Sequence, residues 1–516
     1  MKLDEFTDKI KQLPAAIPIR HGMVDAALLR NLCEQNVRDG GRLVALWGSD
    51  ERAQEAGYVL HVLLATGDGL LCLTLPVSAE RPAYPDISDL YPGASRMQRA
   101  AADLLGLHAT GADDQRKWLR HASWPSGMHP LRKDFDGNTV YPTETDAYPF
   151  VAVSGEGVHE IPVGPVHAGT IEPGHFRFSI IGDRVLRLEE RLGYKHKGIE
   201  KRFESMSMEQ GAKLAGRVSG DSTVAYAWAY AMAAESVAGV TPPDQALWLR
   251  ALFLERERVA NHLGDLGYLG NDVALAFGFA QFWILKEQLL RNNAALFGHR
   301  YLMDRIIPGG VTVGLKRQDK RVIEDECDML AREVATLRSI YEEHAGMQDR
   351  FIGAGYVAPP LAARLGLCGL PGRASSQSWD ARAQFACAPY DKLQVQMATH
   401  HNGDVAARVI VRFDEVFESL RLQRAILVNL VGGDELSAPV GQLPGHALGI
   451  GLVEGWRGEV MVALHTDAAG NLGRVHPHDP SWQNWPVLEH AIIGNIVPDF
   501  PLINKSFNLS YCGVDL

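Results

Sequence analysis

A stripe of ionisable residues lies in the middle of the chain. Glu255, Arg258, His262 and Asp265 follow one another at steps of three and four residues, among leucine, phenylalanine and valine. In an α-helix this spacing places all four side chains on one face. Such groups inside a helical bundle must be paired, because an isolated buried charge is very costly. The pattern therefore indicates a buried ion-pair network, and its alternative is a proton path toward a membrane partner.

Two other positions combine an imidazole with a carboxylate. His196 and Glu200 are four residues apart, so they would share one face near the start of a helix. This pair can relay a proton, since an imidazole titrates near neutral pH, or it can tie a sheet to the helices. A third candidate, His167, lies on a Pro-Val-His-Ala-Gly loop, where it either contacts a ligand or caps a turn.

The elements that must position these residues fall into two regions. The first reads as mixed α/β, with a helix, three strands and a helix over 26–38, 42–47, 58–64, 70–77 and 95–107. Residues 124–150 are rich in Pro, Gly, Asp and Thr and have no periodicity, which indicates a linker. We therefore place a domain boundary near residue 150, with domains at 1–150 and 151–516.

The second region reads as a helical bundle flanked by small sheets. Its helices have apolar residues at helical spacing and are predicted over 208–238, 243–265, 277–303, 319–345 and 404–432. Its strands are predicted over 151–161, 175–181, 185–192, 459–465 and 472–475, before an extended tail. The expected fold class is α+β, a small N-terminal α/β domain followed by a mainly helical-bundle domain with flanking small β-sheets.

Composition limits the functions open to the chain. A net charge of −11 over 516 residues gives no basic excess, so nucleic acid is not expected as a partner. The longest charge-free apolar run, 273–285, is too short to span a bilayer, and the N-terminus does not read as a signal peptide. The six cysteines form no C-x-x-C pair, so no cofactor is expected within the chain and any iron–sulfur cluster must belong to a partner. No G-x-G-x-x-G follows a strand, so a nicotinamide site is not expected either.

Short motifs in a fixed order give the chain a family resemblance. They are HPLRKDF at 129–135, GPVH at 164–167, LGYKHKGIEK at 192–201 and ERERxxNH at 255–262. The first region is similar to the 30-kDa subunit of complex I. The second resembles the family shared by the quinone-reactive 49-kDa subunit of complex I and the large subunit of membrane-bound, energy-converting nickel–iron hydrogenases. The fused layout and the GYKHKGIEK segment are most similar to the hydrogenase-4 and formate hydrogenlyase branch.

At four positions where hydrogenases of this family have nickel-binding cysteines, the chain has other residues. Ser219 and Ser222 stand in the motif R-x-C-G-x-C, and Ser510 and Gly513 stand in the C-terminal motif D-P-C-x-x-C. A hydroxyl or a hydrogen cannot replace a thiolate as a ligand of a soft transition metal. Cys512, displaced by one position, cannot hold a two-metal centre alone. Nickel and hydrogen chemistry are therefore not expected.

The resemblance also bears on a quinone site. The histidine of complex I that matches His167 contacts the quinone headgroup, whereas Arg217 stands where that subunit has its quinone-bonding tyrosine, and Tyr226 lies two turns later. In a vacant metal cavity Arg217 would bind an anionic or polar headgroup, or form a salt bridge with Asp221 four residues on. A quinone is thus a candidate ligand. The residues expected to line the cavity or its approach are His167, His196, Glu200, Arg217 and Asp221.

The resemblance implies a peripheral subunit of a hetero-oligomeric oxidoreductase on the cytoplasmic side of the cell membrane. Its expected partners are a small subunit with a 4Fe–4S cluster and antiporter-like membrane subunits. Electrons from NAD(P)H or ferredoxin would pass through that cluster to a quinone or similar acceptor and drive ion translocation, without nickel catalysis. The alternative is a subunit of the same assembly that has no redox chemistry and transmits only conformational change.

Overall fold

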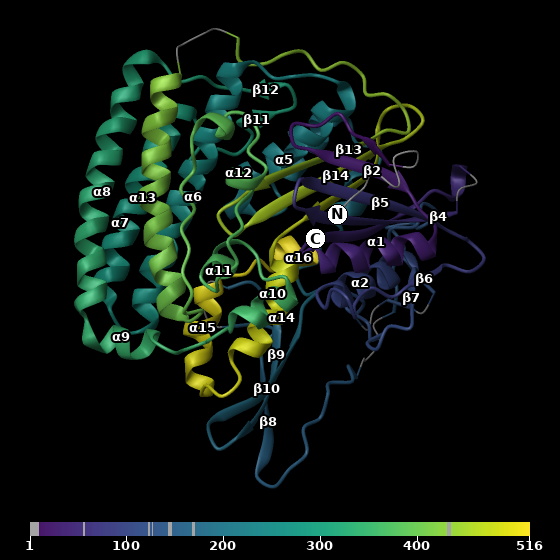
Figure 1. The fold of residues 1–516 in the computed structure, drawn as a ribbon, viewed down its shortest axis with the longest axis horizontal. Helices are drawn as coiled ribbons and strands as arrows, with labels where there is room; N and C mark the ends of the chain where they lie inside the picture. The colour runs from purple at the N-terminus through teal and green to yellow at the C-terminus, as the bar shows by residue number, and fades with distance from the viewer. Residues whose placement is uncertain are drawn as a thin grey trace.

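The computed structural model describes residues 10–54, 57–121, 124–125, 127–142, 147–167, 171–430 and 435–516. Long helices pack side by side on one flank of the molecule, and the larger sheets lie on the other (Figure 1). Helices and several small sheets are mixed along the chain, which confirms the α+β class expected from the sequence. No helix in these described ranges is both long and apolar enough to cross a membrane.

The N-terminal region is a five-stranded sheet with two helices. Its strand order is β1-β2-β5-β4-β3, and only β2 and β5 run parallel. Helix α1 starts where the Asp25 carboxylate accepts the Leu28 N–H at 2.8 Å. The elements of this region are β1 (Ile10–Gln12), β2 (Ile19–Met23), α1 (Ala26–Arg38), β3 (Arg42–Asp50), β4 (Tyr58–Thr66), β5 (Gly69–Val77) and α2 (Ala94–Leu105), with a small parallel pair of β6 (Ala83–Pro85) and β7 (His108–Thr110) beside them. The five predicted elements, now α1, β3, β4, β5 and α2, are confirmed, whereas β1, β2, β6 and β7 were not predicted.

Between β7 and β8 (Val158–Val163), none of the described residues lies in a helix or strand. The strand predicted over 151–161 therefore begins later than expected. The physical reason is that the Val151 N–H bonds to the Glu189 carboxylate at 2.8 Å and is not paired in a sheet. Strand β8 continues a three-stranded antiparallel sheet with β9 (His175–Ile181) and β10 (Arg184–Arg191), which projects from the body (Figure 1).

Four long helices form the helical flank. They are α6 (Asp244–Asp272), α7 (Ala276–Phe297), α8 (Lys320–Glu343) and α13 (Val405–Asn429) (Figure 1). The apolar spacing predicts their packing, since the buried residues of α8 recur at steps of three and four. These residues are Ile323, Cys327, Leu330, Val334, Leu337 and Tyr341.

The prediction of a single helix over 208–238 is wrong, because two helices with a break between them occupy this range. Helix α4 (Met208–Ala215) ends, a 3₁₀ turn covers Gly220–Ser222, and α5 (Thr223–Ala238) begins. Ser219 is extended at φ −139° and ψ 120°, and the Thr223 hydroxyl donates to the Gly216 carbonyl at 2.7 Å. Both serines of the first ligand motif therefore lie at the entry of α5.

Helix α5 packs very closely on a three-stranded sheet. This sheet consists of β13 (Leu448–Glu454), β14 (Glu459–Thr466) and β15 (Leu472–His478). A Cβ atom on Gly449 would lie 2.1 Å from the Ala233 carbonyl oxygen, and one on Gly451 would lie 2.0 Å from that of Ala229. Glycine in β13 and alanine in α5 thus set the distance between the two layers.

We expect Gly451→Ala to lower the free energy of unfolding by about 1–3 kcal/mol, because the added methyl group forces helix and sheet apart. Denaturant unfolding of the purified chain measures the change. Gly441→Ala is the matched control, since a Cβ atom there meets nothing within 4 Å. Equal stability of the two variants would show that this close packing is not needed.

The C-terminal part is helical where an extended tail was predicted. Helices α14 (Ser481–Ala491), α15 (Phe500–Phe507) and α16 (Cys512–Asp515) follow β15. Asn508, with φ +45°, ends α15 and turns the chain back toward α6. The remaining short elements are α3 (Ile199–Phe203), β11 (Ile306–Ile307), β12 (Gly310–Val311), α9 (Ala345–Phe351), α10 (Pro359–Leu365), α11 (Gly369–Arg373) and α12 (Ala381–Gln384).

Candidate functional site

Residues of the two degenerate ligand motifs line one cavity of about 450 Å³. Ser219 and Asp221 come from the turn before α5, Ser510 comes from the segment between α15 and α16, and Cys512 is the first residue of α16. The two segments meet because both pack against α6. Ser222 and Gly513 are buried just behind the cavity wall.

An ion pair between Asp221 and Arg457 joins the two motifs. The Arg457 guanidinium contacts both carboxylate oxygens, at 2.6 and 2.9 Å, and its Nε donates to the Asn508 carbonyl at 2.6 Å. The Ser219 hydroxyl donates to the same carboxylate at 2.6 Å, and that of Ser222 lies 3.4 Å from it. Burial disfavours the charge, but Arg457 lowers the pKa of Asp221 to about 2, so the pair is ionised.

Arg217 does not take part in this arrangement. Its guanidinium pairs with Asp304 at 2.7 Å on an exposed surface, so the expected salt bridge between Arg217 and Asp221 is wrong. The reason is the chain break after α4, since the i to i+4 spacing brings side chains together only within a continuous helix. Tyr226 is buried and donates its hydroxyl to Asp479 at 2.8 Å.

The side chains at the C-terminal ligand positions do not fit a metal. The Ser510 hydroxyl accepts the Gly513 N–H at 2.9 Å, and a Cβ atom on Gly513 would lie 2.5 Å from Asp479 Oδ2. Cys512 is the one thiol at these positions, and a single thiolate cannot hold a two-metal centre. Throughout the described ranges, no three His, Cys, Asp or Glu side chains are placed to hold a metal ion. This donor set therefore does not suit a nickel centre.

The ionisable stripe on α6 forms a buried ion-pair network. Glu255 accepts hydrogen bonds from the hydroxyls of Tyr390 and Ser419, each at 2.6 Å, and from Arg382 at 3.1 Å. Arg258 lies 3.3 Å from the same carboxylate. Burial opposes ionisation, yet these arginines lower the pKa of Glu255, so the carboxylate stays charged.

The network continues along α6 to the cavity. His262 Nε2 lies 2.8 Å from Glu415, and Asp265 pairs with Arg412 at 3.1 Å. The other oxygen of Asp265 accepts the Asn508 amide at 2.6 Å, and Asp265 itself lines the cavity. The last member of the stripe thus connects the charged interior with the site.

Glu257 has different hydrogen-bond partners from Glu255, although the two residues are only two positions apart. Its carboxyl group faces the first turn of α5, where the N–H groups of Val224 and Ala225 approach it at 2.7 and 3.2 Å. Without a paired arginine, burial raises the pKa of Glu257 to about 8. This carboxyl group can therefore exchange a proton near neutral pH, close to Asp221. The spacing of the motif alone gave no sign of this difference.

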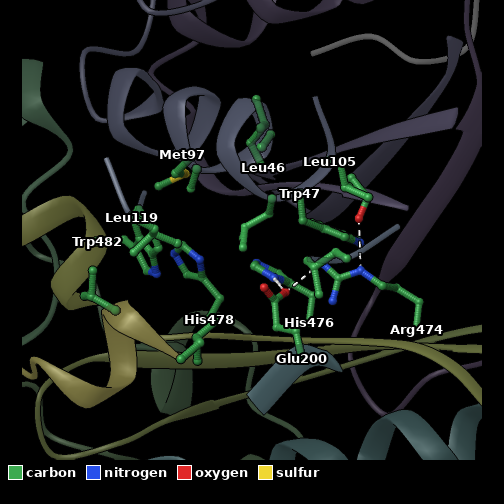
Figure 2. Close-up of a pocket in the computed structure, with 17 residues that line it drawn as sticks. Leu46, Trp47, Met97, Leu105, Leu119, Glu200, Arg474, His476, His478 and Trp482 are labelled. Atoms are coloured by element: carbon green, nitrogen blue, oxygen red, sulfur yellow. Dashed lines mark hydrogen bonds and ion pairs between the residues drawn. The ribbon is translucent and has the colours of Figure 1, made fainter. Parts of the chain in front are cut away.

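His196 and Glu200 do not face each other. Helix α3 starts at Ile199, after Gly198 at φ +65°, so His196 precedes the helix and the expected shared face is wrong. His196 Nδ1 lies 2.7 Å from the Asp515 carbonyl. Glu200 pairs with Arg474 at 2.6 Å and His476 at 2.7 Å in a small enclosed space between the N-terminal region and β15 (Figure 2). Neither residue lines the main cavity.

His167 lies at the edge of the site. Its Nε2 is 2.8 Å from the Gly174 carbonyl, and its ring packs near Phe176. The same β8–β9 loop sends Ile171 and Glu172 into the cavity, and Glu172 accepts the Cys512 N–H at 3.0 Å. His167 itself is not part of the cavity lining, and its role at an approach to the cavity stays a prediction.

Sequence reasoning missed three cations that line the cavity, Arg457, Lys286 and Lys505, and the first two had a visible signal in the sequence. Arg457 lies in the turn Gly455-Trp456-Arg457-Gly458 between β13 and β14, where its guanidinium stacks 3.9 Å from the Trp456 ring centre. Lys286 directly follows the charge-free apolar run of α7 and is the one lysine of that helix. Two features of the sequence could have indicated Arg457 and Lys286. One is an arginine in a turn between two glycines, and the other is a lysine at the end of an apolar run.

The chain joins a domain of the complex I 30-kDa type to one of the complex I 49-kDa type. The family model of the respiratory-chain NADH dehydrogenase 30 Kd subunit matches residues 23–141, and that of the 49 Kd subunit matches residues 272–443. Formate hydrogenlyase subunit 5 of Escherichia coli is 30% identical over 93% of this chain and 85% of that protein. Hydrogenase-4 component G of Escherichia coli is 31% identical over 92% of this chain and 84% of that protein.

The chain belongs to this family of fused complex I and hydrogenase-type large subunits. Its fold is also similar to a chain of an archaeal membrane-bound sulfane sulfur reductase, with a TM-score of 0.66 and 23% identity. That match covers 70% of this chain and 99% of the other. The family resemblance expected from the sequence motifs is therefore confirmed.

Proposed function

We propose that the chain is a nickel-free subunit of the redox arm of a membrane-associated, complex I-like oxidoreductase at the cytoplasmic face. The observation that carries this proposal is the ion pair of Asp221 and Arg457, which is bonded to the serines at the ligand positions. Charged and hydroxyl groups there satisfy one another where the hydrogenase family has thiolates. The cavity then serves an organic acceptor and not a metal centre.

The cavity suits a small-molecule acceptor such as a quinone. Its volume of about 450 Å³ lies within the range of small-ligand sites, roughly 300–1,000 Å³. Electrons would come from NAD(P)H or ferredoxin through a 4Fe–4S cluster in a small partner subunit. Reduction of a quinone to a quinol takes two electrons and two protons, and Glu257 is a proton donor close to the cavity. Antiporter-like membrane subunits would couple this reaction to ion translocation.

A second function is favoured by the same contacts. Arg457 cross-links the turn before α5 with the segment before α16, through Asp221 and Asn508. A cross-link of this kind can transmit conformational change within the assembly without any redox chemistry. The two functions differ in whether turnover depends on an acceptor in the cavity.

We expect the purified complex to contain no stoichiometric nickel and to reduce a naphthoquinone with its natural electron donor. Arg457→Met should lower that turnover by about tenfold or more, because Asp221 loses its charge-assisted bonds. Arg217→Met is the matched control, since this arginine pairs outside the cavity, and should leave turnover unchanged. Stoichiometric nickel with hydrogen evolution would overturn the proposal. Full ion transport by an assembled Arg457→Met complex without acceptor turnover would favour the structural function.

A further inference from the structure

Two ammonium groups line the cavity and form no salt bridge with the residues that the structure describes. Lys286 of α7 and Lys505 of α15 both line it. Lys286 Nζ lies 4.9 Å from the Trp283 ring centre, and Lys505 Nζ lies 4.4 Å from that of Tyr268. Neither lysine forms a hydrogen bond or ion pair with any other residue that the structure describes, so both remain available to a ligand.

The other charges at the cavity are already paired. Asp221 is bound by Arg457, Asp265 by Arg412, and Glu172 lies 3.6 Å from Lys195. Once these pairs are set aside, the two lysines are the charged groups of the described lining that no salt bridge neutralises. An anion is therefore the ligand that complements the cavity.

The backbone of α6 makes room for Lys286. A Cβ atom on Gly264 would lie 2.7 Å from Lys286 Nζ and 3.3 Å from its Cδ, so the lysine stem passes over this glycine. Burial lowers the pKa of Lys286, which means that its charge is poorly solvated in the free protein. A bound anion would offset this cost, since it would add a direct counter-charge to the attraction that Asp265 and Asp221 already exert on Lys286.

The shape of the cavity favours an organic ligand over a bare inorganic ion. Its volume of about 450 Å³ fits a small organic molecule. The aromatic side chains Tyr268, Trp283 and Tyr511 are part of its wall. Aromatic walls bind planar rings well, because flat apolar surfaces stack on one another.

We propose that the cavity binds a small planar organic anion, with its ionised oxygen held by Lys286 and Lys505. The inference rests on the proposed function in one respect, because it concerns the same cavity, and it adds the charge of the ligand. An ionised hydroxyquinone and an aromatic carboxylate share this chemistry. A neutral quinone of the same size does not.

Binding of three probes to the purified complex tests the proposal, by calorimetry at pH 7.5 and low salt. The probes are 2-hydroxy-1,4-naphthoquinone and 2-naphthoate, which are anions, and neutral 2-methyl-1,4-naphthoquinone. We expect the hydroxyquinone, the naphthoate or both to bind about tenfold more tightly than the neutral probe, because a charge-assisted bond contributes that much. The two anionic arms show whether a quinone or a carboxylate is preferred.

Lys286→Met should remove the preference for anions, and Lys286→Arg should keep most of it. Lys316→Met, at an exposed lysine outside the cavity lining, controls for the loss of one positive charge and should bind like the wild type. If Lys286→Met fails to assemble, Gly264→Ala provides a second test, since its methyl group would displace the ammonium group. It should weaken binding of the anions and not of the neutral probe.

Equal affinities for all three probes, or a preference that survives Lys286→Met or Gly264→Ala, would overturn the proposal. Neither result would affect the proposed function if the neutral quinone is still reduced. Conversely, anion binding that depends on Lys286 in a complex without acceptor turnover would support the site and count against the redox function. Failure to bind any of the probes would contradict the anion site.

Discussion

Glu255→Ala is expected to lower the free energy of unfolding by about 3–5 kcal/mol, the cost of leaving buried charges without their partner. The carboxylate is fully buried and receives hydrogen bonds from Arg382, Tyr390 and Ser419, with Arg258 beside it. Its removal takes one acceptor from each of the two buried guanidinium groups, and from the hydroxyls of Tyr390 and Ser419. Since domains of ordinary stability unfold at about 5–15 kcal/mol, the loss would be a large fraction of the total.

Denaturant unfolding measures this effect, and Glu342→Ala is the matched control. Glu342 also pairs with an arginine on a long helix, Arg338 at 2.7 Å, but it lies on the surface. An exposed pair of this kind contributes little, so the control should unfold almost like the wild type. If both variants lost the same small amount, the interior of the bundle would be wetter and less dependent on charge pairing than its burial indicates.

The parts of the fold that could be predicted from the sequence are those fixed by local spacing. The apolar repeat of α8 and the ionisable stripe of α6 each depend on residues three or four positions apart, so the pattern is visible without any tertiary contact. The first strands were also predictable, because their apolar runs are separated by turn residues. For the same reason the stripe was correctly interpreted as a paired, buried network.

The content of the cavity could not be predicted in this way. Asp221 and Arg457 are 236 positions apart and meet only because α5 packs on the β13–β14 hairpin. Local spacing instead favoured Arg217 as the partner, and the chain break after α4 removes that contact. Strand β13 was missed since glycines, which this close packing requires, weaken the usual strand pattern.

The break before α5 also determines how the side chains of the first ligand motif are paired. It places Ser219 and Ser222 beside Asp221, where Arg457 reaches Asp221 and Ser222 from the hairpin turn. Glu257 accepts the N–H groups of Val224 and Ala225 in the first turn of α5. The polar groups at the entry of α5 thus satisfy one another's hydrogen bonds.

Acid is expected to destabilise the contact between the N-terminal region and the second region through buried histidines. His478 is buried there, and its ring centre lies 5.9 Å from that of His476, which stacks on Trp47 at 5.3 Å (Figure 2). His465 is only slightly exposed, and its ring centre lies 4.6 Å from that of His61, which stacks on Trp47 at 5.0 Å. Burial lowers the pKa of His465 and of His478 to about 3, against 6.5 in the unfolded chain. Both histidines are thus neutral in the folded protein, and their protonation favours the unfolded state.

The stability due to these two groups is complete above pH 6.5 and falls as the pH drops from 6.5 toward 3, because only the unfolded chain binds the protons. At pH 5 each histidine accounts for a loss of about 2 kcal/mol, from roughly 1.4 kcal/mol per pH unit. The variant with His465→Phe and His478→Phe should therefore lose about 4 kcal/mol less than the wild type between pH 7 and pH 5 in denaturant unfolding. His108→Phe, at an exposed position, should follow the wild-type curve. An equally steep decline in the double variant would mean that these histidines are already protonated in the folded protein, and that carboxyl groups alone determine its sensitivity to acid.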